Sequence, residues 1–396
     1  MNLIKTYKYK LKLNKKQSAL IDNWIGASRF VYNLAKETKQ TAYQSGINLS
    51  KYELMKQLVE LKEVDWIKSV PSQTLQNVIE RLDFAYRNYF DKLKSGEINK
   101  KKKEYIAKRL SKGLPLNQKK LFDFGKPRWA IKDEYNSILF KSVSKTEKGF
   151  VLPKIGEVIT FKDRVPDGKL KTATIIKNNN AYFICVTFES QSRNLYPTCE
   201  NQAVGIDMGI ACFSVDSNGV FVDNPSHTKK YENVLKVKNR SLARKKKGSV
   251  KFIQTKKELN KLHSKIANVR KDFLHKLSIQ YVKDNSLIVC EDLNVKNMVK
   301  FGNLSKHISD ASWSKFFSMI AYKSMMYEKE FIQINPKYTS QKCSRCGHVD
   351  KENRTTQSKF VCLSCGHQQN ADYNAAANIL GEGIAFKRKR EAVACA

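Results

Sequence analysis

The sequence lacks two features of exported or membrane proteins. Among its 396 residues, no uninterrupted apolar run approaches the roughly 18 residues of a membrane-spanning helix. The N-terminal residues from Met1 to Lys8 contain no apolar segment of the kind found in a signal peptide. We therefore expect a soluble protein that is not exported.

Acidic residues are scarce relative to basic ones. The chain has 73 Lys and Arg against 37 Asp and Glu, which gives a net charge of +36. Because 41% of the residues are hydrophobic, the chain is not disordered, and its length predicts two or three globular units. Such a charge indicates a polyanionic partner, first of all nucleic acid, with an anionic membrane surface as the alternative.

The cysteines predict a metal site and no disulfides. An odd number, nine, in a chain without a signal peptide favours reduced thiols. Five are scattered, and those in apolar stretches are expected to be small buried side chains: Cys185, Cys199, Cys212, Cys290 and Cys395. The others form two Cys-x-x-Cys pairs, each followed by Gly: Cys343, Cys346, Cys362 and Cys365.

Fifteen residues separate the two pairs, which is the spacing of a tetrahedral zinc site. Four free thiols or a redox pair are the alternatives. His348 and His367 are not needed as ligands. Because four thiolates leave zinc no open position, the predicted site is structural and not catalytic.

The periodicity of apolar residues divides the chain into segments. Residues 2 to 13 alternate as a strand, and residues 16 to 93 show helical spacing, with Pro71-Ser72 opening the later helix. The lysine-rich stretch around residues 100 to 120 is expected to be a solvated, mobile linker. From Ser137 short β-type runs follow, with a turn at residues 178 to 180, and indicate a small barrel or sandwich that includes the first strand.

The C-terminal half predicts a second sheet. Residues 203 to 222 are interpreted as two strands joined by an Asn-Gly turn, and residues 287 to 290 as a third, buried strand. Between them, residues 237 to 281 combine helical spacing with many Lys and Arg, which predicts a basic helical insertion that leaves the sheet and returns to it.

Three acids occupy positions where a carboxylate is costly or well placed for chemistry. Asp207 lies inside an apolar strand, Glu291 ends another, and Asp372 starts a helix. A carboxylate in an apolar strand needs a cationic partner, and Mg²⁺ is the one we expect. Carboxylates from separate elements can hold two Mg²⁺ roughly 3.5–4 Å apart and so promote hydrolysis of a phosphodiester. For Asp372 alone, ordinary helix capping is an equal explanation.

An ordered set of motifs resembles the TnpB family, RNA-guided endonucleases of bacterial insertion sequences that are related to type V CRISPR effectors. The motifs cover nearly the whole chain: Tyr7-Lys-Tyr-Lys-Leu, Ser28-Arg-Phe-Val-Tyr-Asn, Leu152-Pro-Lys-Ile-Gly, Gly205-Ile-Asp-Met-Gly-Ile, Val289-Cys-Glu-Asp-Leu-Asn-Val, Ser309-Asp-Ala-Ser-Trp-Ser-Lys-Phe, Thr339-Ser-Gln-Lys-Cys-Ser-Arg-Cys-Gly-His and Asn370-Ala-Asp-Tyr-Asn-Ala-Ala-Ala-Asn-Ile-Leu. By this resemblance Asp207, Glu291 and Asp372 are the three RuvC carboxylates.

The resemblance implies a multidomain α/β fold. Its expected parts are an RNase H-like (RuvC) nuclease core with a helical insertion and a four-cysteine zinc ribbon, a split β-barrel wedge domain, an α-helical recognition domain and a disordered basic tail. The nuclease core is expected at residues 200–380, with the helical insertion at 228–283 and the zinc ribbon at 338–370. The wedge domain is expected at residues 1–14 and 126–192, the recognition domain at 15–125 and the tail at 381–396.

Contacts with nucleic acid are assigned by the same resemblance. Gln73 and Gln76 lie where the family reads a short duplex motif, although an exposed helix face would look the same. Arg29 and Tyr32 either face guide RNA or pack. Residues 387 to 390, Lys-Arg-Lys-Arg, are expected in a tail that touches RNA. Many relatives have Asp-Arg where this chain has Asn370-Ala371, so no role of that Arg is carried over.

The expected function is RNA-guided cleavage of DNA next to a short duplex motif, for a transposable element. The expected cofactors are two Mg²⁺, for which Mn²⁺ can substitute, and structural Zn²⁺. The expected partners of a monomer are one guide RNA and double-stranded target DNA, in the cytoplasm of a bacterium or archaeon near the nucleoid. The alternatives are an RNA-guided repressor without nuclease activity and a strand-joining transposase.

Overall fold

The computed structural model describes residues 2–132, 134–161, 168–178, 181–191, 202–301 and 305–394. The chain forms two compact units, residues 2–191 and residues 192–396. Cys199, Cys395 and two residues of the predicted turn, Asn179 and Asn180, lie outside the described residues. In the described part, no helix combines the length and the apolar character needed to cross a membrane.

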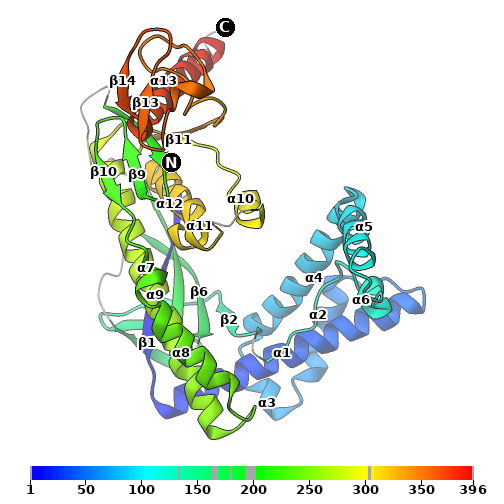
Figure 1. Ribbon diagram of the computed structural model, residues 1–396. Coiled ribbons are helices and arrows are strands. Elements are labelled where there is room, and N and C mark those ends of the chain that lie inside the picture. Colours follow the sequence, from blue (N-terminus) through cyan, green and yellow to red (C-terminus); the bar gives the residue numbers. More distant parts are fainter. Residues whose placement is uncertain are drawn as a thin grey trace. The chain divides into compact units, whose positions relative to one another are not determined.

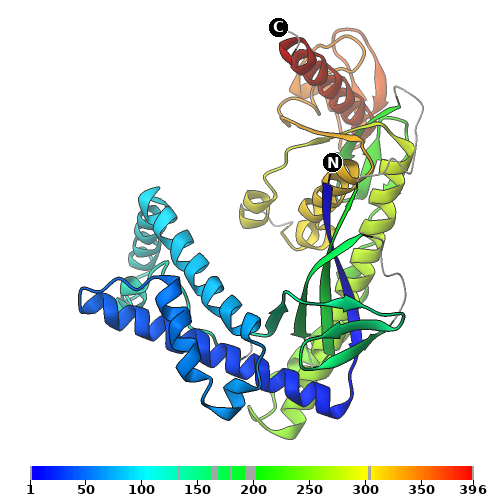
Figure 2. The same ribbon diagram turned by 180° about the vertical axis from the view of Figure 1, so that it is seen from behind.

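The first unit contains a seven-stranded sheet in the order β2-β6-β7-β1-β5-β4-β3. The first strand lies in its middle, between β7 and β5 (blue in Figure 2). Among the described residues, β2 and β3 are the two edge strands of this sheet, and no pairing between them closes it into a barrel. The strands are β1 (Asn2–Lys12), β2 (Ser137–Phe140), β3 (Ser144–Lys145), β4 (Gly149–Leu152), β5 (Gly156–Thr160), β6 (Lys169–Asn178) and β7 (Ala181–Gln191).

Helices of the first unit share one apolar core with this sheet. Trp24 of α1 is completely buried, and its ring lies 6.2 Å from that of Phe140 in β2. As the sequence predicts, α4 begins at Ser72, directly after Pro71. The helices are α1 (Lys15–Gln44), α2 (Lys51–Leu61), α3 (Asp65–Lys68), α4 (Ser72–Lys94), α5 (Glu97–Leu110) and α6 (Gln118–Phe122).

The lysine-rich stretch is largely helical, so the expectation of a mobile linker was wrong. Residues 97 to 110 form α5 and residues 118 to 122 form α6. Lysine favours helices, and Glu97 in the first turn pairs with Lys101 one turn later, which stabilises a mostly exposed helix. Charge repulsion along the lysines does not prevent a helix when each charge faces water.

The second unit contains a five-stranded sheet in the order β10-β9-β8-β11-β12 (Figure 1). Residues 203 to 223 form three strands where two were predicted, because a tight turn at Gly209 separates the first two and the Asn218-Gly219 turn joins the last two. The strands are β8 (Ala203–Met208), β9 (Cys212–Asp216), β10 (Phe221–Asp223), β11 (Leu287–Glu291) and β12 (Glu330–Ile334).

The predicted basic insertion is confirmed as helices between β10 and β11, and further helices follow β11. They are α7 (His227–Lys230), α8 (Glu232–Ala243), α9 (Val250–Asp284), α10 (Val295–Phe301), α11 (Ser305–Ala311), α12 (Trp313–Met326) and α13 (Ala371–Ala394). Before α13, a small ribbon contains η1 (Lys351–Asn353), β13 (Lys359–Val361) and β14 (Gln368–Asn370).

The two faces of the five-stranded sheet have different covers. Val204, Ile206 and Ile288 share a core with residues of α9 and α12. Because side chains alternate along a strand, the next residues face the other way, and Leu287 and Val289 pack with Ile379 of α13. Thus α13 covers the face to which the side chains of odd-numbered residues in β8 and β11 point.

Glycine allows α13 to lie directly on β8. A Cβ at Gly205 would lie 2.3 Å from the carbonyl oxygen of Ala376 and 2.6 Å from the nitrogen of Leu380. On the helix, a Cβ at Gly383 would lie 2.4 Å from a methyl group of Val289. The distance between helix and sheet is therefore set by residues without side chains.

The expected disordered tail is also helical, at least through residue 394, which corrects that prediction. Residues 381 to 394 continue α13. Lys387 and Arg390, expected to touch RNA, both pair with Glu330 of β12. Helix-favouring residues, contact at Gly383 and these ion pairs together explain the order of the segment.

We predict that Gly205→Ala lowers the free energy of unfolding by about 1–3 kcal/mol, because backbone atoms of α13 cannot move aside as a flexible side chain would. Gly381→Ala on α13 is the matched control, since nothing lies within 4 Å of its Cβ position. It should leave stability unchanged or raise it by up to about 1 kcal/mol. Denaturant unfolding of both variants measures this, and equal stability of the two would contradict the close approach.

Candidate functional site

Two of the predicted acids lie near the carboxyl ends of neighbouring strands in the five-stranded sheet. β8 and β11 are parallel, with Val289 opposite Gly205 and Cys290 opposite Ile206. The next residues are Asp207 and Glu291. Their side chains therefore point to the same face of the sheet, the one that α13 covers.

The third acid comes from the start of that helix. Asp372 lies in the first turn of α13. The side chain of Asn370 accepts hydrogen bonds from the backbone nitrogens of Asp372 and Tyr373, at 2.9 and 3.2 Å. Asn370 therefore caps the helix, and the carboxylate of Asp372 is not used for capping.

All three acids line one cavity of about 260 Å³, which we call the acidic cavity. Asp207 and Asp372 are half-buried and Glu291 is buried. Burial, followed by the charges of Glu291 and Asp372, raises the pKa of Asp207 to about 8. Burial also raises the pKa of Glu291. The cavity thus concentrates negative charge that, without a cation, is relieved by protonation.

Sequence reasoning missed two residues of the acidic cavity. Arg354, from the segment between the two cysteine pairs, donates to Asp372 Oδ1 at 2.8 Å and lowers the pKa of Asp207. Thr339, which is buried, donates from Oγ1 to Glu291 Oε1 at 2.5 Å. No local pattern marks Arg354. Thr339 opens the ribbon motif, but its spacing gives no sign of this contact.

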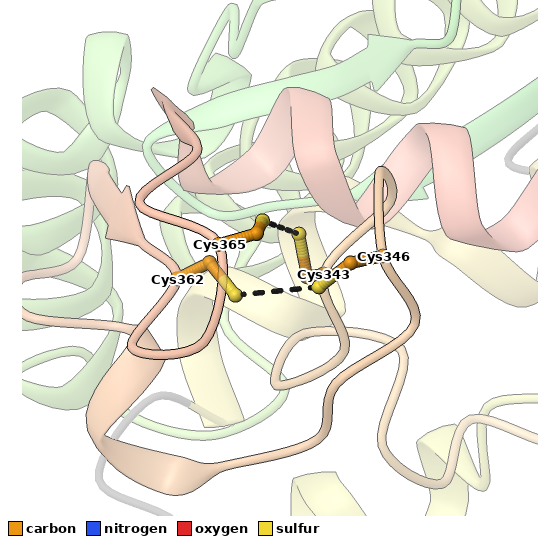
Figure 3. Close-up of side chains that lie close together, drawn as sticks. All are labelled: Cys343, Cys346, Cys362 and Cys365. Carbon is orange, nitrogen blue, oxygen red and sulfur yellow. Dashed lines mark hydrogen bonds between the residues drawn. The ribbon is translucent and has the colours of Figure 1, made fainter.

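The four predicted cysteines form one cluster (Figure 3). Their sulfur atoms all lie within 4.8 Å of one another. Cys343 and Cys365 are 3.8 Å apart, and Cys346 and Cys362 are 3.6 Å apart. Thiolates at tetrahedral corners, each about 2.3 Å from zinc, would be about 3.8 Å apart, so the cluster fits structural zinc.

The electrostatics of the cluster favour a thiolate at Cys362, whereas the pKa of the Cys346 thiol is raised. Burial opposes ionisation of Cys362, but backbone N–H groups of Cys365 and Ser364 and the neighbouring thiols lower its pKa to about 6. A thiolate is the form that binds a metal. No side chain other than the four cysteines belongs to this group of potential ligands in the described part of the chain.

Asparagines of α13 hold the ribbon next to the acidic cavity. Asn374 donates to the carbonyl of Lys342 and accepts from the nitrogen of Ser344. Asn378, one turn later, donates to the carbonyls of Thr339 and Lys342. The repeated asparagines in the last sequence motif thus satisfy backbone groups of the ribbon, and they fix the loop that carries Thr339.

The residues predicted to contact nucleic acid lie in the first unit. Gln73 and Gln76 are exposed on α4, and their spacing of three puts them on one face of the helix. Arg29 is half-buried on α1. Tyr32 packs against Tyr135, with ring centres 5.8 Å apart. These positions leave both explanations of each residue open, so the contacts stay predictions.

Fold and site together define a mixed α/β, multidomain protein in which an acidic cavity adjoins a four-cysteine cluster. Comparison with known families gives three matches. Residues 1–48 match "Helix-turn-helix domain", residues 183–302 match "Probable transposase" of the IS605 OrfB type, and residues 313–379 match "Cas12f1-like, TNB domain". The last match contains the cysteine cluster.

The chain belongs to the TnpB family, also called IS605 OrfB. It is 32% identical to "Putative RNA-guided DNA endonuclease InsQ" of Escherichia coli (strain K12), over 97% of this chain and 94% of that protein. It is 29% identical to "Putative RNA-guided DNA endonuclease" of Streptomyces pristinaespiralis, over 96% and 90%. Cas12f1 of Sulfoacidibacillus thermotolerans, a CRISPR-associated endodeoxyribonuclease, is 30% identical over 56% of both chains.

Solved structures give a weaker similarity. A cryo-EM structure of a Cas12f1–sgRNA–target DNA complex aligns with a TM-score of 0.47 and 14% identity, over 96% of this chain and 98% of that one. CasPhi-2 bound to crRNA gives 0.47 and 12%, over 96% and 98%.

We predict that Cys343→Ser removes zinc from the protein and lowers its stability, since three thiolates no longer close the site. Elemental analysis should find about one zinc per wild-type chain and much less in the variant. The control is a Cys185→Ser variant, whose substitution lies in the other unit; this variant should retain its zinc. If wild-type protein purified with zinc present contained none, the cluster would not be a zinc site.

A second prediction concerns pH. Because the folded, metal-free protein raises the pKa of Asp207 from 3.8 to about 8, it binds this proton more tightly than the unfolded chain does. The contribution of Asp207 to stability should therefore fall as pH rises from about 4 to about 8. Asp207→Asn should flatten this dependence and raise the free energy of unfolding at pH 8 by roughly 2–4 kcal/mol. Unfolding of zinc-loaded wild type and variant without added Mg²⁺ or Mn²⁺, across this pH range, measures it; a variant less stable than wild type at pH 8 would contradict the assigned electrostatics.

Proposed function

We propose that the protein is an RNA-guided DNA endonuclease of an IS605-type transposable element, with the acidic cavity as its cutting site. One observation carries the proposal. Three acids from two strand ends and a helix start line one cavity, in a chain whose relatives of nearly equal length are named as RNA-guided DNA endonucleases. The five-stranded order, with two antiparallel strands beside three parallel ones, supports assignment of the sheet as an RNase H-like (RuvC) core.

The residues of the acidic cavity fit Mg²⁺. Their oxygen atoms are the ligands that Mg²⁺ prefers. Burial, followed by the charges of Glu291 and Asp372, raises the pKa of Asp207, and a divalent cation would favour the charged carboxylate instead. Asp207, Glu291 and Asp372 would hold the metal ions. When bound, Mg²⁺ or Mn²⁺ supplies the charge that activates water and stabilises the leaving oxygen of a phosphodiester.

Side chains of the chain itself set the geometry of these ligands. Thr339 fixes one oxygen of Glu291, Oε1, through its hydrogen bond. Arg354 holds Asp372 and adds a positive charge at the cavity wall, where a DNA phosphate would enter. We propose that both act as positioning residues, and that Arg354 also attracts the phosphate.

Guide RNA and target DNA are the proposed partners. Base pairing between them would supply sequence specificity, and the charge of +36 would supply affinity for phosphates. We assign the helices at residues 15–125 to recognition and the seven-stranded sheet to a wedge domain. Gln73 and Gln76, exposed on one face of α4, are the proposed readers of the short duplex motif.

The triad separates this proposal from its rivals. Asp207→Ala, Glu291→Ala or Asp372→Ala should each abolish DNA cleavage, while affinity for guide RNA and target stays within a few-fold of wild type, because affinity comes from cations spread over a large surface. Cleavage assays with the copurified guide, in Mg²⁺, Mn²⁺, Ca²⁺ and EDTA, measure this. Mg²⁺ and Mn²⁺ should support cutting, and EDTA should stop it.

The matched control is Asp284→Ala, which removes an exposed acid from the same unit outside the acidic cavity and should leave cleavage unchanged. Cleavage by guide-loaded Asp207→Ala at the wild-type rate would sink the nuclease assignment. Wild-type protein that binds target with its guide but never cuts would instead be an RNA-guided repressor, and joined DNA strands among the products would indicate a transposase.

A further inference from the structure

A second cavity, of about 760 Å³, lies in the first unit beside α5 and α6. We call it the aromatic cavity. Tyr105 of α5 lines it together with residues of α6 and of the segment that follows. Its lining combines two rings, three cations and one acid: Tyr105, Phe124, Lys120, Lys126, Arg128 and Asp123. Neither the acids nor the cysteines of the proposed cutting site take part in it.

The rings and cations of the aromatic cavity are in contact. The rings of Tyr105 and Phe124 are 5.8 Å apart. The ammonium of Lys120 lies 4.5 Å from the centre of the Tyr105 ring. The ammonium of Lys126 lies 3.6 Å from the centre of Phe122, whose side chain is 72% exposed. Ring faces and positive charges therefore occur together at one place on the surface.

A buried lysine adds an unusual charge to this region. Lys36 of α1 is only 3% exposed, and its ammonium lies 3.6 Å from the centre of the Trp129 ring. Burial lowers the pKa of Lys36; among its charged neighbours Asp123 raises it and Lys126 lowers it. Within the described residues no carboxylate lies within ion-pair distance of Lys36, and Asp123 pairs instead with Lys126, at 3.8 Å.

The wall that carries these groups is fixed to α1. Asn33 and Ala130 exchange two hydrogen bonds, from Asn33 Nδ2 to the carbonyl of Ala130 at 3.0 Å and from the nitrogen of Ala130 to Asn33 Oδ1 at 2.8 Å. The residues next to Ala130, Arg128 and Trp129, therefore keep their places relative to Lys36. The region is built before any ligand arrives.

These observations define the ligand. The buried ammonium of Lys36 has the Trp129 ring as its partner and no carboxylate within ion-pair distance among the described residues, so its positive charge would attract an anion bound nearby. Tyr105 and Phe124 are both half-exposed. Rings that reach the surface beside lysines are the combination with which proteins bind single-stranded nucleic acid, where bases stack on the rings and phosphates meet the cations. A base within a duplex offers no free face, so the fitting ligand is unpaired. The cavity volume is within the range of about 300–1,000 Å³ typical of small-ligand sites.

We propose that the aromatic cavity binds an unpaired nucleotide, with its base on Tyr105 or Phe124 and its phosphate beside Lys126, where the buried charge of Lys36 also acts. The identity of the strand rests on the function proposed above, which provides two sources with the same chemistry: an unpaired part of the guide RNA, or a single strand of opened target DNA.

Ultraviolet crosslinking tests the proposal and distinguishes the sources. Protein with its copurified RNA is irradiated alone, and again after addition of target DNA, and crosslinked peptides are identified by mass spectrometry. A nucleotide adduct on Tyr105 or Phe124 in the RNA-only sample would assign the cavity to guide RNA, and an adduct on either ring that appears only with DNA would assign it to a DNA strand. Adducts elsewhere in the protein but on none of these rings, in either sample, would overturn the proposal.

Variants give an independent measure. Tyr105→Leu should weaken binding of the crosslinked strand by roughly 5- to 150-fold, the range for loss of one stacked base, and Tyr105→Phe should restore it. Phe161→Leu is the control, because its ring also lies near a lysine ammonium, Lys10 at 5.2 Å, but outside the aromatic cavity. Equal affinities of Tyr105→Leu, Phe161→Leu and wild type would contradict the proposal.

Lys36→Met separates a binding role from a structural one. Methionine keeps the packing volume and removes the charge. If Lys36 serves an anion, free protein should keep its melting temperature or gain a few degrees, while binding of nucleic acid weakens. If Lys36 serves only the fold, stability falls and affinity of the folded protein is unchanged, which would count against the site.

The aromatic-cavity proposal can be wrong even if the proposed endonuclease function is right. If wild-type protein cleaves DNA with its guide but gives no adduct on Tyr105 or Phe124, only the aromatic-cavity proposal is contradicted. A protein that binds neither RNA nor DNA would contradict both.

Discussion

The contact between α13 and the five-stranded sheet is the constraint on which the acidic site depends. It requires glycine at 205, where any side chain would meet the backbone of the helix. The same helix carries Asp372 in its first turn and, through Asn374 and Asn378, holds the ribbon that supplies Thr339 and Arg354. One close approach between backbones thus brings together groups from segments far apart in the sequence.

The electrostatics of the acidic cavity run against those of the chain as a whole. The protein carries a large excess of positive charge, yet the cavity concentrates three acids near a single arginine. Burial, followed by the charges of Glu291 and Asp372, raises the pKa of Asp207, so without a metal ion this carboxyl tends to be protonated. Such an arrangement lowers stability, and it is understandable as a site built for divalent cations. The aromatic cavity of the other unit has the opposite composition, cations around rings, which suits a ligand that brings its own negative charge.

Several elements followed from the sequence, and others did not, for identifiable reasons. The first strand, the helix after Pro71 and the insertion before β11 were predicted from periodicity. The predictions of a disordered tail and a mobile lysine-rich stretch were wrong, because they rested only on the high density of positive charge in these segments. Ion pairs such as Glu97 with Lys101 and Arg390 with Glu330 show that these charges are compatible with helices. The turn at Gly209 was missed because one residue can end a strand within an apolar run.

By itself, the sequence determined the cysteine cluster, the three acids and the excess of positive charge. The cysteine spacing is local and allows few geometries, and a carboxylate inside an apolar strand is conspicuous wherever it occurs. Only the tertiary structure decided that Arg354 pairs with Asp372, that Thr339 holds Glu291, and that Lys36 lies buried beside Trp129. These pairs join residues whose own neighbours carry no signal. Their proximity results from how helices pack on sheets and on one another, which local periodicity does not encode.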